Sequence, residues 1–334
     1  MNRARSGGAV LLFVLVLVAL LAALAVQTVR TAEIEVFTAY AGVYARQAEA
    51  MAESGLLAAG TLLLEDSRQQ LSDNLTEDWA AFPELSAYPG RWFLDGHVSG
   101  RIEDETGKFP INSLHPGLRD HTVFEGIFLR LLQAKPFALS SDKAQALLAA
   151  LVDWLDADDA PRSGGAEDAT YAAARLPYRV KNTSLDTLGE LLLVKGFSRD
   201  LLYGHDATPG LLSVLTVWGP GLININTAPL PVLTALPTNL DATRTASVAK
   251  AADAYRRDPV RRDELAGTGW LQKAVTEQDV AWPSQVLTTR SQYFSVTIEG
   301  RSGAATRRLY AVLKRGRERG SGDSRCDILY RQLR

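Results

Sequence analysis

The sequence predicts an α+β protein. A long N-terminal helix, transmembrane and then amphipathic, packs on a small antiparallel sheet, and a large all-α domain is inserted into that sheet. Three observations predict this arrangement. An apolar N-terminal run continues without proline as an amphipathic pattern. Strand patterns occur near residue 100 and return only after residue 290. Helical patterns fill the stretch between them. At 334 residues, the chain is long enough for such a nested arrangement.

The composition excludes several classes of protein. With 46% hydrophobic and 22% charged residues, the chain is globular rather than disordered. Its single cysteine, Cys326, excludes an internal disulfide framework and a cysteine-rich zinc module. A net charge of −2 provides no long-range attraction to nucleic acid.

The first feature along the chain is an apolar segment of membrane-crossing length. Residues 9–26 are all apolar, and no charge occurs between Arg5 and Arg30. As a helix rising about 1.5 Å per residue, the segment nearly crosses a hydrocarbon core of about 30 Å. Arg3 and Arg5 precede it, which predicts a cytoplasmic N-terminus with the rest of the chain on the far side.

Three interpretations of this segment are open. A cleaved secretory signal would use the small residues Ala23 and Ala25, although its apolar core is longer than the roughly 7–15 residues expected. An uncleaved signal anchor is the second. In the third, the leader MNRARSGG ends in glycine directly before the apolar helix, which resembles the class III leader of type IV pilins and pseudopilins. That resemblance implies cleavage after Gly8, or after Gly7, with Ala9 as the new N-terminus in the first case.

The residues that follow favour the third interpretation. No proline occurs between Gln27 and Glu65, and apolar residues recur at helical spacing. They are Ile34, Phe37, Ala41, Tyr44, Ala48, Met51, Leu56, Leu57, Ala59 and Leu63. The membrane helix is therefore expected to continue as an amphipathic helix over 27–66. A cleaved signal has no reason to be continuous with the mature fold, whereas a pilin-type helix packs its neighbours with one half and its own sheet with the other.

Strand patterns flank a helical region. The turn pair Asp95-Gly96 separates strand-like runs at 91–94 and 97–103 and predicts a hairpin. Further strands are expected at 292–299, 304–314 and 326–333. Residues 315–324 (RGRERGSGDS) form a polar, glycine-rich stretch that predicts a loop without packing. Helices are expected at 123–134, 141–155, 185–194, 229–236 and 242–257.

These patterns divide the chain into consecutive parts. They are a leader at 1–8, a transmembrane helix at 9–26, an amphipathic helix at 27–66, the first part of the sheet at 67–114, an inserted α-helical domain at 115–287 and the C-terminal strands at 288–334.

Four internal segments, taken in order, resemble the K-type minor pseudopilin family of the type II secretion system. They are Glu103–Leu114 (EDETGKFPINSL), Leu151–Tyr171 (LVDWLDADDAPRSGGAEDATY), Pro177–Leu193 (PYRVKNTSLDTLGELLL) and Leu222–Leu236 (LININTAPLPVLTAL). With the leader and the last strands, the resemblance covers essentially the whole chain. It implies a pilin-type sheet and a non-enzymatic subunit that caps the tip of the periplasmic pseudopilus and helps to initiate its assembly for protein export.

The resemblance also implies processing, partners and location. The prepilin peptidase would release Ala9, which would be methylated. Other minor pseudopilins of types I and J would form a heterocomplex with the chain, and secreted substrates and the outer-membrane secretin are further expected contacts. The chain would cross the bacterial inner membrane once, with its C-terminal domain in the periplasm. Phe13 stands at mature position five, where most pilin-like subunits carry glutamate, and the K-type family characteristically lacks that acid.

The densest cluster of functional residues is acidic, and we expect it to bind a structural calcium ion. Its members are Asp153, Asp156, Asp158, Asp159, Glu167 and Asp168. Calcium takes six to eight oxygen ligands, and so many carboxylates close together would otherwise repel one another. The spacing resembles an EF-hand, but Pro161 occupies the position where that loop requires glycine. K-type subunits are associated with calcium in the inserted domain, which supports the expectation; a solvated acidic loop is the alternative.

Two other kinds of chemistry find less support. Residues 223–237 resemble the opening of a helix-hairpin-helix module, but residues 238–241 lack the glycines that let backbone amides approach a phosphate. Thr227 and Pro229 are then expected to cap and begin a structural helix. No hydrolase motif surrounds the four histidines, so no catalytic residue is assigned. The alternative functions are a signal-anchored periplasmic metal-dependent hydrolase and a DNA-uptake protein.

Overall fold

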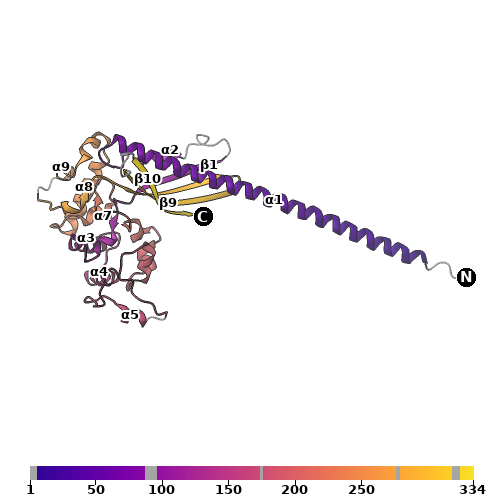
Figure 1. Ribbon diagram of the computed structural model, residues 1–334, viewed down its shortest axis with the longest axis horizontal. Helices are drawn as coiled ribbons and strands as arrows, with labels where there is room; N and C mark the ends of the chain where they lie inside the picture. The colour runs from indigo at the N-terminus through magenta and orange to yellow at the C-terminus, as the bar shows by residue number, and fades with distance from the viewer. Residues whose placement is uncertain (1–5, 87–95, 174–175, 276–278, 318–323) are drawn as a thin grey trace.

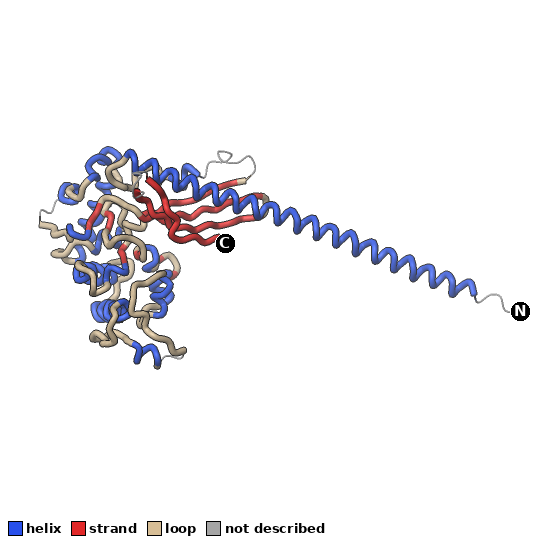
Figure 2. The backbone as a smooth tube through the Cα atoms, viewed as in Figure 1, coloured by secondary structure: helices blue, strands red, loops and turns tan. Residues whose placement is uncertain are grey.

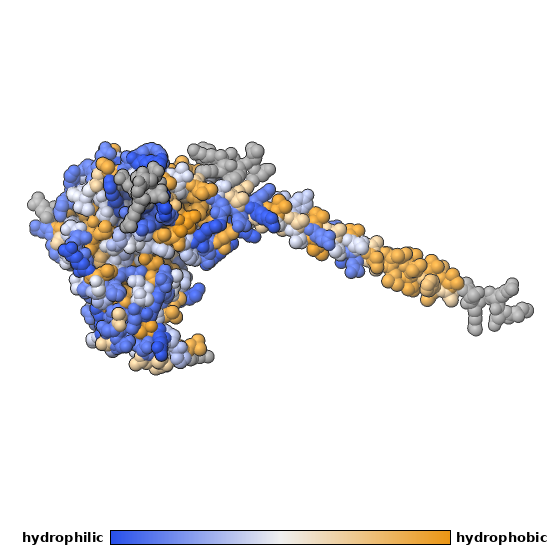
Figure 3. All heavy atoms as spheres, viewed as in Figure 1, coloured by the Kyte–Doolittle hydropathy of each residue, from blue (hydrophilic) through white to orange (hydrophobic). Residues whose placement is uncertain are grey.

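One continuous helix joins the apolar segment to the folded head. The computed structural model describes residues 6–86, 96–173, 176–275, 279–317 and 324–334. Helix α1 (Ser6–Gln69) is 64 residues long, which confirms the expected continuous helix. It projects far from the head (Figure 1), and its N-terminal part forms an apolar band (Figure 3). This helix is long and apolar enough to cross a membrane.

The amphipathic stripe of α1 divides into two parts. From residue 8 to residue 44 every side chain is exposed, including Ile34 and Phe37. Farther along, Ala48, Met51, Ala52, Leu56, Ala59 and Leu63 are buried against the sheet. Leu57 was expected on the same stripe but is 71% exposed, because it follows Leu56 by one residue and points about 100° away around the helix.

The sheet has four antiparallel strands in the order β1-β8-β9-β10. They are β1 (His97–Asp104), β8 (Tyr293–Ser302), β9 (Ala305–Arg317) and β10 (Ser324–Leu333). Figure 2 shows α1 running along this sheet. Helix and sheet approach so closely at Gly300 that a Cβ there would lie 2.1 Å from the Ala48 carbonyl oxygen. Glycine at this position therefore lets the helix lie against β8.

The expected strands at 97–103, 292–299, 304–314 and 326–333 are confirmed, with two qualifications. Strand β9 continues through Arg317, so the start of the expected loop at 315–324 is wrong: Arg315 lies in the strand and is buried. Its ion pairs with distant acids explain why local composition did not predict this burial. The expected hairpin arm at 91–94 lies outside the described residues. β1 pairs with β8, nearly 200 residues away.

The chain between β1 and β8 forms the inserted region. The helices of this part are α3 (His121–Gln133), α4 (Ser141–Leu155), α5 (Asp168–Ala172), α6 (Arg199–Tyr203), α7 (Leu230–Ala235), α8 (Ala242–Arg256) and α9 (Trp270–Ala274); α2 (Phe82–Ser86) precedes β1. Its 3-10 helices are η1 (Ile111–Leu114), η2 (Leu188–Leu193), η3 (Leu211–Ser213), η4 (Pro259–Ala266) and η5 (Ser284–Val286). The described insert thus contains the expected helices, joined by loops and short strands. A separate hydrophobic core runs through it from Phe109 to Leu287.

Short strand pairs tie the insert together. They are β2 (Phe109–Pro110) with β5 (Leu215–Thr216), β3 (Gly204–His205) with β4 (Thr208–Pro209), and β6 (Ile223–Asn224) with β7 (Leu287–Thr288). The expected helix at 185–194 is the shorter 3-10 helix η2. Thr187 and Glu190 form a capping box at its start.

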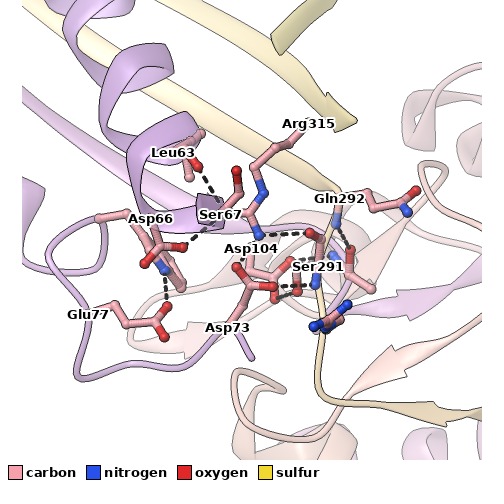
Figure 4. A network of polar contacts seen from close by, with 12 residues as sticks. Leu63, Asp66, Ser67, Asp73, Glu77, Asp104, Ser291, Gln292 and Arg315 are labelled. Carbon is pink, nitrogen blue, oxygen red and sulfur yellow. Dashed lines mark hydrogen bonds and ion pairs between the residues drawn. The ribbon is translucent and has the colours of Figure 1, made fainter. Parts of the chain in front are cut away.

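A buried polar network joins the head to the insert (Figure 4). The Arg315 guanidinium, on β9, forms ion pairs with Asp66 at the end of α1 and with Asp73 just beyond it. Arg315 also donates to the carbonyl oxygens of Leu63 and Ser291, each at 3.0 Å. These contacts hold the end of α1 and the start of β8 at one charged centre.

Asp104, the last residue of β1, carries the network into the insert. Its carboxylate accepts hydrogen bonds from the hydroxyls of Ser291 and Thr227, and from Asn224 Nδ2 at 3.2 Å. Thr227 was expected to cap α7. It binds Asp104 instead, and Pro229 is the cap residue, without a side-chain hydrogen bond. Burial raises the pKa of Asp104 to about 6.

Candidate functional site

The acidic cluster lies between two helices of the insert. Helix α4 ends at Leu155 with Asp156 as its C-cap, and α5 begins at Asp168 with Glu167 as its N-cap. One carboxylate oxygen each from Asp156, Asp158 and Glu167 lie within 4.8 Å of one another. The structure therefore brings together three of the six residues that the sequence predicted as metal ligands.

Several oxygens at this site are buried without a hydrogen-bond donor among the described residues. They are Asp156 Oδ1, Glu167 Oε1, Glu167 Oε2 and Asn182 Oδ1. Burial, followed by the nearby carboxylates of Asp153 and Asp156, raises the pKa of Glu167 to about 7. Burial and the carboxylate of Asp158 also raise the pKa of Asp156. Asp158 is exposed, and its Oδ1 accepts from the Ala160 amide at 2.9 Å. The buried oxygens without donors fit a hard cation such as calcium, which would satisfy them.

The carboxylates of the other three predicted ligands, Asp153, Asp159 and Asp168, accept hydrogen bonds that hold the surrounding loops. Asp153 is fully buried, and its carboxylate accepts from the backbone amides of Arg162 (3.2 Å) and Ala166 (2.7 Å). A Cβ at Gly165 would lie 1.9 Å from Asp153 Oδ2, so this close turn requires glycine. Asp153 thus positions the loop that ends at Glu167.

Asp159 and Asp168 hold a second loop beside the first. Asp168 Oδ1 accepts from the amide of Val180 at 2.8 Å. Asp159 Oδ1 accepts from Asn182 Nδ2 at 3.4 Å, and the same amide group donates to the Asp158 carbonyl oxygen at 3.3 Å.

Asn182 is the residue that sequence reasoning missed. It lies 24 positions after Asp158, has a φ of 51° and carries an unpaired buried oxygen. Asparagine is among the few residues that adopt this left-handed conformation readily. The only available signal was its place within the resembling segment 177–193, since neither its spacing nor its charge marks it as a ligand.

A second group of acids is already satisfied by protein contacts. Asp66, Asp73 and Glu77 also place carboxylate oxygens within 4.8 Å of one another. Arg315 pairs with the first two, while Glu77 accepts from Asn74 Nδ2 (2.8 Å) and Trp79 Nε1 (2.7 Å). This group therefore belongs to the junction between head and insert.

In the segment that resembles a helix-hairpin-helix module, the backbone amides that would bind a phosphate already donate to a carboxylate. The Asp241 carboxylate, at the N-cap of α8, accepts from the amides of Thr243 (2.9 Å) and Arg244 (3.0 Å). Those are the amides that a phosphate would approach at a helix N-terminus. The geometry supports the structural interpretation of this segment.

The N-terminal residues lie on an unpartnered part of α1. Gly8 and Ala9 fall in its first turns, and a Cβ at Gly8 would meet no atom within 4 Å. Phe13 is 69% exposed. Cleavage after Gly8 stays a prediction.

These features define a class of protein: a pilin-type subunit that has an N-terminal helix capable of crossing a membrane and a helical region inserted into its sheet. A family model described as type II secretion system protein K matches residues 107–203. The chain is 30% identical over 320 residues to type II secretion system protein K of Pectobacterium carotovorum subsp. carotovorum, covering 90% of each. The chain belongs to the type II secretion system protein K family.

A further relative and a solved structure are also similar to this chain. The protein K of Pseudomonas aeruginosa is 27% identical over 326 residues, covering 95% of this chain and 91% of that one. Among solved structures, the GspK-GspI-GspJ complex of the enterotoxigenic Escherichia coli type 2 secretion system contains a chain of similar fold. The TM-score is 0.57 at 18% identity, covering 91% of this chain and 99% of that chain.

Proposed function

We propose that the chain is the minor pseudopilin that caps the tip of a type II secretion pseudopilus and helps to initiate its assembly. The observation that carries this proposal is the position of the insert. It emerges between β1 and β8 at the end of the head remote from the apolar end of α1 (Figure 1). A bulky domain there obstructs a further subunit above, while the exposed half of α1 remains available to the subunits below.

The apolar run supports the same position. It contains no acid, and Phe13 stands where a glutamate would contact the N-terminus of a neighbouring subunit above. An ionised side chain without a partner is costly in the membrane. A subunit with nothing above it is more stable without that acid.

Replacing residues 107–288 by a short glycine-serine linker tests the capping role. These bounds follow the insert's core, and the linker is short because Asp104 and Phe294 are paired neighbours on β1 and β8. We expect pseudopili of uncontrolled length and reduced secretion, measured by electron microscopy and by export of a substrate.

A second variant carries an unrelated helical domain of similar size in place of the insert. This variant should restore control of filament length if the bulk of the inserted domain alone prevents a further subunit from adding above it. Co-purification with the other minor pseudopilins verifies that both variants fold. Normal filament length and normal secretion from an assembled linker variant would rule out the capping role.

A structural calcium ion at Asp156, Asp158 and Glu167 is the second part of the proposal, with the Asn182 side-chain oxygen as a further ligand. The buried oxygens without donors support it. The ion would hold the 156–167 loop against the segment around Asn182. Its role there is structural, because it would join two loops.

Calcium removal tests this site. We expect chelation to lower the melting temperature and titration of the stripped protein to restore it. Glu167→Gln should weaken calcium binding at least about tenfold, because one carboxylate oxygen becomes an amide nitrogen. The control is Asp142→Asn, an exposed acid in the first turn of the same α4. Equal calcium affinity in the two variants would contradict the assignment.

The remaining parts follow from family membership and the helix. Partners would be minor pseudopilins of types I and J, with the prepilin peptidase releasing Ala9 for methylation. The chain would also contact secreted substrates and the secretin, and its head would lie in the periplasm. The hydrolase alternative is not favoured, since a secretion-system component matches over 90% of the chain.

A further inference from the structure

A basic cavity of about 880 Å³ lies on the insert, where the end of α3, the loop after it, α7 and the start of α8 meet. Leu230, Pro231, Leu240 and Ala246 give it apolar walls. Three cations also line it: Arg130, Lys135 and Lys250. None of the described residues that line it carries a carboxylate.

The cations of this cavity have no anionic partner among the residues that the structure describes. Arg130 Nε donates to the Ala235 carbonyl oxygen at 2.7 Å, and burial lowers the pKa of this guanidinium. Lys135 and Lys250 are exposed. By contrast, the junction network pairs the buried Arg315 with two carboxylates. A half-buried cation with only a carbonyl partner gains most from an incoming anion.

We propose that this cavity binds an acidic segment of a partner protein that also carries an apolar side chain. The apolar walls would take the side chain, and Arg130, Lys135 and Lys250 would face the carboxylates. The volume falls within the roughly 300–1,000 Å³ of typical ligand sites and suits a few residues rather than a folded surface. Charge complementarity favours an acidic occupant, because cations line the cavity although the chain as a whole has a net charge of −2.

Nucleic acid is the less suitable occupant. The nearby helix-hairpin-helix turn has no glycine, and Asp241 fills the amides that would bind a phosphate. The apolar walls have no role in binding phosphates but match an aliphatic side chain.

Fluorescence anisotropy on the full chain in detergent tests the proposal. The probes are fluorescein-labelled short peptides of alternating glutamate and leucine, glutamate and serine, or lysine and leucine, together with a single-stranded oligonucleotide. We expect the glutamate-leucine peptide to bind most tightly, with an affinity that falls as salt rises. Tighter binding of the lysine peptide or the oligonucleotide, or equal binding of the serine peptide, would overturn the proposal.

Charge reversal locates the site. The double variant Lys135→Glu with Lys250→Glu should weaken binding of the glutamate-leucine peptide at least about tenfold. The matched control is Arg119→Glu with Lys143→Glu, which makes the same change in net charge at exposed residues outside the cavity. Binding should be nearly unchanged in this control. Similar weakening in both double variants would overturn the proposal, because it would show a response to overall charge alone. An unchanged melting temperature in both establishes that they fold.

Discussion

Replacing Arg315 by alanine is expected to lower the free energy of unfolding by about 3–5 kcal/mol. The Arg315 side chain is 8% exposed, and its partners Asp66 and Asp73 are 8% and 4% exposed. Truncation would leave two carboxylates close together in the interior without their cation. It would also remove the guanidinium donors from the Leu63 and Ser291 carbonyl oxygens. Denaturant unfolding of the full chain in detergent measures the loss.

The control for this change lies on the same strand. Arg308 also forms an ion pair, with Glu299 at 2.9 Å, but its side chain is 65% exposed. Arg308→Ala should therefore cost less than about 1 kcal/mol. Arg315→Lys should recover only part of the loss, because an ammonium cannot reproduce the forked contacts to two acids and two carbonyls. Losses of equal size at Arg315 and Arg308 would show that the junction network contributes little.

Replacing Asp104 by asparagine is expected to change how stability depends on pH. Burial raises the pKa of Asp104 from 3.8 to about 6 in the folded protein. The folded state therefore favours the protonated acid. The stability that this proton contributes is fully present below pH 4 and is lost as the pH rises through 6. The asparagine variant has no such proton, so it should gain about 3 kcal/mol relative to the native chain between pH 3 and pH 7.

Because the groups around Asp104 are the same in the native chain and the asparagine variant, the difference in stability between the two reports on Asp104. The hydroxyls of Ser291 and Thr227 can turn to meet an amide, while the nearby Asp73 remains in both proteins. Asp66, whose pKa burial also raises to about 6, is likewise common to both, so its contribution largely cancels. Unfolding at a series of pH values measures the difference. Parallel stability curves would contradict the role assigned to Asp104.

Glu299 provides a control of opposite sign. Its hydrogen bonds from Arg308 and Arg301 lower the pKa of this carboxylate. Its contribution is therefore present at neutral pH and is lost as the pH falls through the folded pKa. Glu299→Gln should lose stability relative to the native chain as the pH rises, the reverse of Asp104→Asn. A shift in the same direction for both would point to a general charge effect.

Local patterns predicted most elements of this protein correctly. The absence of proline from residue 27 to residue 65 and the helical spacing of apolar residues predicted a helix that is continuous through Gln69. Alternation predicted β8 because strand faces repeat every second residue, the Asp95-Gly96 turn pair predicted β1, and strand-like runs near the C-terminus predicted β9 and β10. The helices expected at 141–155 and 242–257 are confirmed as α4 and α8, which Ser140 and Asp241 cap by accepting backbone hydrogen bonds.

The acidic site could be predicted only in part. Composition identified a loop rich in carboxylates, but six acids near one another in sequence could not be ranked as ligands. The structure gathers Asp156, Asp158 and Glu167, and uses Asp153 to hold the loop through its backbone amides. Asn182 belongs to a separate loop, so the spacing of the acids along the sequence could not predict it.

The sequence by itself determined the anchor helix, the strands, the helical character of the insert and the family. Each of these depends on periodicity, on composition or on motifs that follow one another in a fixed order, and all three are local features of the sequence. Tertiary structure alone decided that Arg315 is buried in β9, that Thr227 binds Asp104 rather than capping α7, and that Asn182 joins the acidic loop. Arg315 and Asp73 are 242 positions apart, and Thr227 and Asp104 are 123 apart. Burial and pairing at such separations depend on which surfaces the fold brings together, and local propensity carries no information about that.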